Sequence, residues 1–167
     1  LNPGSVYFVR QQNPSGLGHA IWCARKFISN EPVAILLADD LIDAKPGCMK
    51  QMIQNWRGGN MIATTNVQNK ETSSYGIISP GKIIGNKIEV KNIIEKPKKD
   101  MTINAGIYVL SKKCLRYLKY NQHIDMTDFI LKLIKEKKKI IAYPFFESWH
   151  DLGSKEDLKI FKNFASI

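Results

Sequence analysis

Residues 33–40 have the sequence Val-Ala-Ile-Leu-Leu-Ala-Asp-Asp, in which six apolar side chains are followed by two carboxylates. A strand that is apolar on both faces is typical of the centre of a parallel sheet covered by helices. In open α/β sheets, ligands bind at the carboxyl ends of the strands. Residues 33–38 therefore predict a central parallel strand, and Asp39 and Asp40 mark a candidate site at its end.

Strand-like and helix-like patterns alternate on both sides of this strand. We expect strands at 6–9, 61–67, 104–110 and 140–146, and helices at about 20–27, 47–56, 112–120, 127–138 and 154–164. Between about 74 and 103, short β-prone pieces separated by Gly81 and Gly85 predict an antiparallel excursion. The fold class is therefore α/β: one domain, residues 1–167, with a mostly parallel, Rossmann-like sheet flanked by helices and an antiparallel β insertion.

The composition is that of a globular chain: of 167 residues, 44% are hydrophobic and 24% are charged. No apolar run approaches the roughly 20 residues that cross a bilayer, and no secretory signal pattern is present. The three cysteines, Cys23, Cys48 and Cys114, are far apart and form no CxxC pair, which argues against a disulfide framework and a structural zinc site. We expect a cytoplasmic protein.

The net charge of +10 predicts an anionic partner: nucleic acid, an anionic membrane or a phosphorylated metabolite. The lysine clusters at 96–99 and 135–139 carry no interleaved aromatic residues, and no nucleic-acid-binding signature is present. A genome rich in A and T would also favour Lys and Asn. Nucleic-acid binding therefore rests on charge alone, and we expect neither a nucleic-acid nor a membrane partner.

A second carboxylate, Asp151, follows the last expected strand in the sequence Trp149-His150-Asp151-Leu152-Gly153. If that strand lies near residues 33–38, Asp151 and Asp39 converge on one hard cation such as Mg²⁺, which takes one or two protein carboxylates. Such a site neutralises phosphate charge during phosphoryl or nucleotidyl transfer. The alternative is that Asp39 or Asp40 only caps the following loop.

The loop from Gln11 to His19 contains two glycines but is neither a P-loop nor a dinucleotide-binding fingerprint. Its glycines allow the backbone to approach a flat ligand, and the amide of Gln11 can donate and accept a hydrogen bond, which suits a pyrimidine edge. A tight strand-to-helix turn is the alternative. Three weaker candidates remain ambiguous between structural and sugar-binding roles: Tyr75-Gly76, Glu95-Lys96 and Asn104-Ala105-Gly106.

Taken together and in this order, these motifs resemble the sugar-1-phosphate nucleotidylyltransferases, above all the bacterial UTP–glucose-1-phosphate uridylyltransferases. The resemblance covers essentially the whole chain and is most specific in the first hundred residues. It is carried by Arg10-Gln11-Gln12, Gly16-Leu17-Gly18-His19-Ala20, Leu36-Leu37-Ala38-Asp39-Asp40, Lys50-Gln51-Met52, Ser74-Tyr75-Gly76-Ile77-Ile78 and Ile94-Glu95-Lys96-Pro97.

The resemblance implies a role for each position. Gln11 and Gly16 would contact the uracil base, and Asp39 and Asp151 would bind Mg²⁺. Lys96 would hold the sugar phosphate, which makes Asp39, Asp151 and Lys96 the implied catalytic residues. The remaining implied substrate-binding residues are Tyr75, Gly76, Glu95, Asn104 and Gly106, with Gly76, Glu95 and Asn104 on glucose hydroxyls.

The implied partners are UTP and a hexose 1-phosphate, and the implied assembly is a homo-oligomer. A phosphate oxygen of the sugar phosphate would attack the α-phosphorus of UTP, which releases pyrophosphate and forms UDP-glucose. In this scheme the protein positions its substrates and neutralises charge, and it supplies no covalent nucleophile.

Two departures from the family pattern leave alternatives open. The family's opening strand and Gly-rich loop, with the Arg and Lys that hold the triphosphate, do not precede Leu1, so we expect little or no transferase activity from this chain alone. In addition, Asn104-Ala105-Gly106-Ile107-Tyr108 and Trp149-His150-Asp151 are more similar to thymidylyl- and guanylyltransferases. The alternatives are thus such a transferase acting on another hexose phosphate, or a truncated, inactive domain that binds nucleotide sugars.

Overall fold

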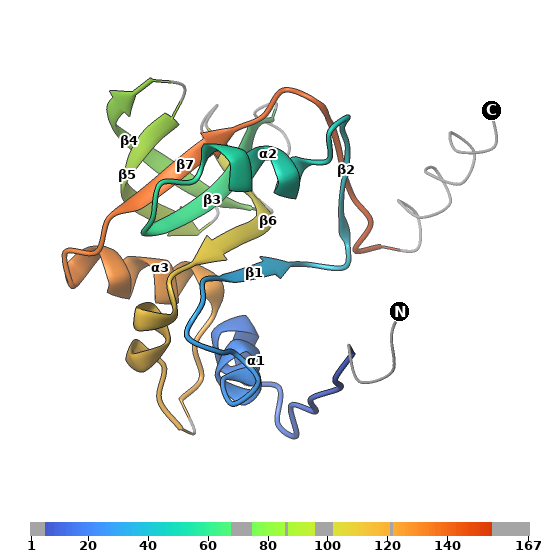
Figure 1. The fold of residues 1–167 in the computed structure, drawn as a ribbon, viewed down its shortest axis with the longest axis vertical. Coiled ribbons are helices and arrows are strands. Elements are labelled where there is room, and N and C mark those ends of the chain that lie inside the picture. The colour runs from blue at the N-terminus through green and yellow to red at the C-terminus, as the bar shows by residue number, and fades with distance from the viewer. Residues whose placement is uncertain (1–5, 68–74, 86, 96–101, 121, 155–167) are drawn as a thin grey trace.

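The computed structural model describes residues 6–67, 75–85, 87–95, 102–120 and 122–154, with only the backbone of 94 and 95 (Figure 1). A six-stranded sheet has the order β1-β6-β3-β7-β5-β4, and β2 and β8 form a separate two-stranded sheet. The strands are β1 Val33–Leu36, β2 Asp40–Asp43, β3 Asn60–Asn66, β4 Gly76–Ile84, β5 Lys87–Glu95, β6 Thr102–Leu110, β7 Ile140–Pro144 and β8 Ser148–Asp151. The helices are α1 Gly16–Ala24, α2 Cys48–Asn55, the 3₁₀ helix η2 Lys112–Tyr117 and α3 Met126–Lys135.

The α/β class is confirmed, but the expectation of a mostly parallel sheet is wrong. Only β3 and β7 pair in parallel among the described strands, and β6 runs antiparallel to both β1 and β3. β1 is an edge strand rather than a central one, and its alternate residues Ala34 and Leu36 are exposed. An apolar run predicts burial but carries no information about the direction of the neighbouring strand. Here that neighbour is β6, which follows the β4–β5 hairpin and runs antiparallel to β1.

The antiparallel insertion is confirmed as the β4–β5 hairpin, but it is part of the main sheet. Ile77 of β4 pairs with Ile103 of β6, and Ile88 of β5 pairs with Ala142 of β7. Gly81 does not end a strand as the sequence suggested. β4 continues through it with register shifts around Pro80, because a bulge accommodates residues that cannot keep the regular ladder.

Two other expectations differ from the structure, one strand pairing was not foreseen, and one expected helix is not tested. Residues 6–9 form no strand and are exposed, and the expected helix at 112–120 is the shorter 3₁₀ helix η2. The pairing of β2 with β8 was not expected. Apart from Ser154, the expected helix at 154–164 lies outside the described residues. No helix in the described part of the chain has the length and hydrophobicity that a membrane span requires.

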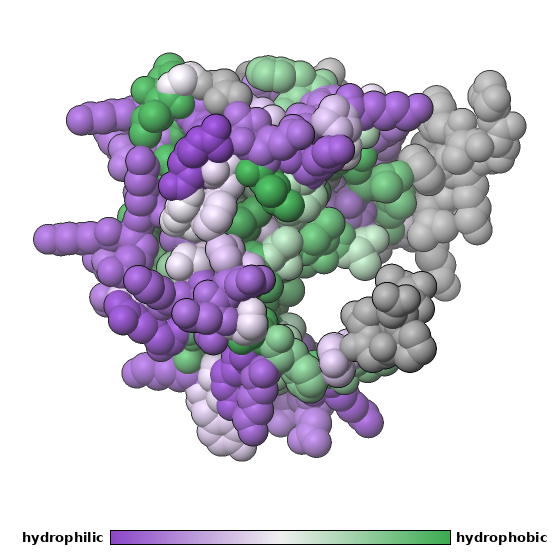
Figure 2. Space-filling model, viewed as in Figure 1, coloured by the Kyte–Doolittle hydropathy of each residue, from purple (hydrophilic) through white to green (hydrophobic). Residues whose placement is uncertain are grey.

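Two apolar cores lie on opposite faces of the sheet, and β6 serves both. Tyr108 and Leu110 belong to the core that includes α3, whereas Ala105, Ile107 and Val109 belong to the core that includes α2. Because successive side chains of a strand point to opposite faces, this alternation shows that β6 is covered on both sides, as are β3 and β7, which also contribute residues to both cores. Figure 2 shows apolar side chains over β1 and β6 in the middle of the face that Figure 1 presents.

Candidate functional site

Two predicted metal ligands meet where β1 ends and the small sheet closes. Asp40 of β2 pairs in register with Asp151 of β8, and the backbone N–H of Leu152 donates to the carbonyl of Asp39 at 2.7 Å. A Cβ added to Gly153 would lie 3.0 Å from Asp151 Oδ1 and 3.7 Å from Asp39 Oδ2. The structure therefore brings Asp39 and Asp151 together, and their binding of a metal ion stays a prediction.

Sequence reasoning did not assign Asp40 a place in this group. Trp149 Nε1 donates to Asp40 Oδ1 at 3.0 Å, and a Cβ at Gly106 would lie 1.5 Å from Asp40 Oδ2. The pKa of Asp40 is raised to about 6, mainly by burial and to a smaller extent by the negative charges of Asp39 and Asp151, and the Trp149 hydrogen bond opposes this rise. Trp149 and Asp151 are two residues apart, so in a strand their side chains point to the same face. This spacing was the signal in the sequence that could have linked Trp149 to the carboxylate group.

The donor set of this carboxylate group fits a hard divalent cation that keeps most of its water. Asp39 is exposed and Asp151 is half-buried, so both can reach a hydrated ion. Among the described residues, no three His, Cys, Asp or Glu side chains are placed to enclose a metal ion by themselves. Two carboxylates are enough for a hard divalent cation that takes its other ligands from water and substrate phosphates.

The raised pKa of Asp40 predicts a pH-dependent stability. The folded state holds the proton more tightly than the unfolded state, where the pKa is near 3.8, so Asp40 lowers stability as the pH rises from about 4 to about 6. Asp40→Asn keeps an acceptor for Trp149 and should raise the free energy of unfolding by about 1 kcal/mol at pH 7.5, after discounting for solvent screening, with no gain at pH 4. Urea denaturation in metal-free buffer measures both values.

The matched control for this prediction is Asp43→Asn, because Asp43 is an exposed carboxylate on the same strand. It removes the same formal charge, but from an exposed position, so no buried carboxylate is neutralised. An equal gain for Asp43→Asn, or a gain for Asp40→Asn that persists unchanged at pH 4, would contradict the prediction.

The predicted base-binding residues Gln11 and Gly16 are also brought together. Gln11 Nε2 donates to the carbonyl of Gly16 at 3.1 Å and lies 2.8 Å from Nδ1 of His19. His19 is buried, with 8% of its surface exposed, and its ring stacks on Trp22. The structure thus places His19 against the candidate base-binding amide.

The glycines of this loop serve the protein's own packing. Gly18 donates its backbone N–H to the carbonyl of Ile124 at 2.9 Å, and Ile124 donates to the carbonyl of Ser15 at 3.0 Å. Gly16 has a φ of +83°, and a Cβ there would lie 2.5 Å from the Ile124 carbonyl oxygen. The two glycines, which suggested that the backbone closely approaches a ligand, therefore allow it to approach residues 124–125 closely.

The predicted sugar-binding residues are only partly connected to the carboxylates. Tyr75 donates its hydroxyl to Asp151 Oδ2 at 3.1 Å, and Gly76 pairs with Glu95 through the backbone of β4 and β5. Asn104 donates to the Tyr108 hydroxyl at 2.6 Å and accepts from the Gly106 N–H at 3.3 Å. The side chain of Glu95 and all of Lys96 lie outside the described residues, so their predicted roles are not examined by this geometry.

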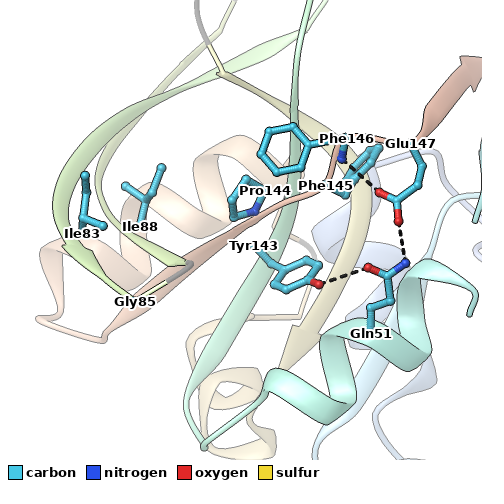
Figure 3. Close-up of a pocket in the computed structure, with 9 residues that line it drawn as sticks. All are labelled: Gln51, Ile83, Gly85, Ile88, Tyr143, Pro144, Phe145, Phe146 and Glu147. Atoms are coloured by element: carbon cyan, nitrogen blue, oxygen red, sulfur yellow. Dashed lines mark hydrogen bonds between the residues drawn. The ribbon is translucent and has the colours of Figure 1, made fainter.

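A cavity of about 570 Å³ lies elsewhere and contains none of the predicted site residues (Figure 3). It is bounded by the tip of the β4–β5 hairpin, the end of β7 and Gln51 of α2. Gln51 donates to Glu147 at 2.6 Å and accepts from the Tyr143 hydroxyl at 3.1 Å, so the Lys50-Gln51-Met52 motif fastens α2 to the strand that leads to Asp151.

A family model described as "Nucleotidyl transferase" matches residues 4–165 of the chain. The UTP–glucose-1-phosphate uridylyltransferase of Bacillus subtilis is 36% identical over 165 residues, which cover 92% of this chain and 56% of that protein. The chain thus spans about half the length of the curated relatives it matches.

Two solved structures have the same fold. A UDP-glucose pyrophosphorylase in complex with UDP-glucose superposes with a TM-score of 0.80 at 32% identity, covering 94% of this chain and 66% of the other. A UTP-bound UGPase from Acinetobacter baumannii superposes with a TM-score of 0.81 at 29% identity, covering 96% and 60%.

Proposed function

This chain belongs to the nucleotidyl transferase family, and on that premise we propose that it carries part of a UTP–glucose-1-phosphate uridylyltransferase. The convergence of Asp39 and Asp151 at the end of the small sheet is the observation that supports this proposal most strongly. The substrates would be UTP and a hexose 1-phosphate, of which glucose 1-phosphate is the favoured candidate. The products would be UDP-glucose and pyrophosphate. We further propose that residues 1–167 form one domain, in the cytoplasm, that assembles into homo-oligomers without a nucleic-acid or membrane partner.

In this proposal, Asp39 and Asp151 hold Mg²⁺, and Tyr75 orients Asp151 through its hydroxyl group. The ion, when bound, supplies positive charge beside the phosphates. A phosphate oxygen of the sugar phosphate forms a bond to the α-phosphorus as the bond to the leaving pyrophosphate breaks. Lys96 holds the sugar phosphate, while Gly76, Glu95, Asn104 and Gly106 complete the sugar site.

The geometry of Gln11 favours one type of base. Both hydrogens of Nε2 are directed at protein acceptors, Gly16 O and His19 Nδ1. Oε1 receives no hydrogen bond from the described residues, so Gln11 offers a ligand an acceptor only. Uracil, thymine and guanine present a ring N–H beside a carbonyl, whereas cytosine and adenine present an unprotonated ring nitrogen there. The proposal therefore includes thymidylyl and guanylyl transfer as alternatives and ranks cytidylyl transfer below them, because cytosine can donate to Oε1 only from its exocyclic amino group.

Calorimetric titration of the chain with UDP-glucose in Mg²⁺ tests the proposed function, with dTDP-glucose and GDP-mannose as comparators. We expect UDP-glucose to bind more tightly than either comparator. Preference for a comparator would replace the substrate while keeping the reaction class. Failure of a folded sample to bind any of the three would contradict the proposal for this chain, and it would equally contradict the alternative of an inactive domain that binds nucleotide sugars.

His19→Phe is expected to reduce the preference for UDP-glucose over CDP-glucose about tenfold. Phenylalanine retains a ring against Trp22 but offers no acceptor to Gln11 Nε2, so the amide is free to rotate and present a donor. Calorimetry with both ligands gives the ratio. Cys23→Ala, a change to a neighbour 4.0 Å from the His19 ring, is the control and should leave the ratio unaltered. The positioning role would be wrong if Gln11→Ala abolished the preference while His19→Phe retained it.

A further inference from the structure

A small basic pocket lies at the edge of the sheet where β3 and β7 begin and β6 ends. It has a volume of about 180 Å³ and draws its cations from η2 and from the turn between α3 and β7. Its lining residues are Gly59, Asn60, Ser111, Lys113, Cys114, Arg116, Lys138 and Lys139. In Figure 2, hydrophilic side chains dominate the side of the molecule on which α3 lies.

The floor of this basic pocket is held by the buried amide of Asn60, with 3% of its surface exposed. Asn60 Nδ2 donates to the carbonyl of Lys139 at 3.1 Å, and Oδ1 accepts from the Ser111 N–H and from the Cys114 thiol, each at 3.1 Å. One side chain therefore ties together the two segments that carry the cations and the start of β3. The backbone segments that carry these lysines and the arginine are consequently held around one concavity.

The cations of the pocket have no carboxylate partner within the described part of the chain. Lys113, Arg116, Lys138 and Lys139 form no ion pair there, and no acidic residue lines the pocket. Arg116 bonds the Tyr117 hydroxyl at 3.1 Å, and Glu136, which interacts with Arg116 electrostatically, lies outside the lining. Four positive charges around one small cavity repel one another, and a bound anion would relieve that repulsion.

We propose that this basic pocket is a binding site for a phosphate group. Three lysines supply point charges, and the planar guanidinium of Arg116 can bond two phosphate oxygens at once. The cavity is large enough for one phosphate and too small for a whole nucleotide. Five residues of extended chain separate Gly106, which contacts Asp40, from Ser111, so the pocket lies roughly 16 Å from the carboxylate group. It is distinct from the proposed active site.

Titration of the ¹⁵N-labelled chain with inorganic phosphate, followed by NMR, tests this proposal. We expect saturable shifts of the backbone amides of Asn60, Ser111, Cys114 and Lys139, and none with sodium chloride at matched ionic strength. In a second arm, glucose 1-phosphate replaces phosphate. Equal binding there would identify the ligand as any phosphate ester, and selective binding of inorganic phosphate would identify free phosphate.

The charge-reversed variant Lys113→Glu/Arg116→Glu should weaken phosphate binding at least tenfold. The matched control is Lys82→Glu/Lys91→Glu, which makes the same change in net charge on exposed residues of the β4–β5 hairpin and should leave the affinity unchanged. The milder variant Lys138→Ala should weaken binding measurably and serves if the double variant fails to fold. The proposal would be overturned by shifts that are absent or not saturable, or by shifts confined to residues 16–18 and 37–40. It would also be overturned by equal losses of affinity in both double variants.

Discussion

Replacing Asp151 with asparagine is expected to weaken the Mg²⁺-dependent binding of UDP-glucose on the order of 100-fold. Asp151 Oδ1 accepts the N–H of Gly153 at 2.8 Å, and asparagine can preserve that bond and the end of β8. What it loses is the negative charge beside Asp39, together with the oxygen that accepts the Tyr75 hydroxyl at 3.1 Å. The backbone should therefore remain intact while the cation site loses one of its two proposed ligands.

Calorimetric titration with UDP-glucose, in Mg²⁺ and in EDTA, measures this effect as the ratio of the two dissociation constants. The ratio should fall towards one in Asp151→Asn and remain large in Asp43→Asn, which removes an exposed carboxylate from the far end of β2. A ratio in Asp151→Asn equal to that of the wild type would remove Asp151 from the metal site. An equal fall in both variants would point to a general effect of net charge.

Gly106→Ala is expected to lower the free energy of unfolding by about 2–4 kcal/mol. Gly106 has a φ of +70°, and a Cβ there would lie 1.5 Å from Asp40 Oδ2 and 3.1 Å from Asp40 Cβ. An alanine must therefore adopt a left-handed backbone conformation and also displace the Asp40 carboxylate. Displacing it breaks the 3.0 Å hydrogen bond from Trp149 and shifts β2 relative to β6.

Urea denaturation measures this cost, and two comparisons isolate its cause. Gly47→Ala should alter stability by less than about 0.5 kcal/mol, because nothing lies within 4 Å of a Cβ at Gly47. In an Asp40→Ala background, Gly106→Ala should cost less, since the clashing carboxylate is gone. The same cost in both backgrounds would show that the backbone conformation, and not contact with Asp40, is responsible.

Several features of the fold and the site were predictable because they depend on local pattern. The apolar run at 33–38, the hairpin at 74–103 and the helix ending before Gly58 follow from periodicity and turn residues. The position of Asp39 and Asp151 after two expected strands led to one candidate cation site, and their carboxylates are close in the structure. The roles of Lys96 and Glu95 remain predictions from that resemblance.

Other features depend on which segments meet, which no local pattern contains. The apolar run predicted that β1 would be buried on both faces, but β6 lies between β1 and β3 and reverses the strand direction there. β2 and β8 are only four residues each, too short for a clear alternation, and they exist because they pair with one another.

The sequence by itself determined the α/β class, the family and the residue types of the candidate site, since these depend on composition, spacing and motif order. The tertiary structure alone decided that Asp40 is buried against Gly106 and Trp149, that His19 orients Gln11, and that Asn60 gathers four cations into a pocket. The contacts of Asp40 and of Asn60 join segments that are far apart in the sequence, whereas His19 and Gln11 are neighbours in one loop and helix start. The contacts between distant segments form because packing both faces of β6 brings those segments together, and only then do burial and neighbouring charge change the chemistry of a side chain.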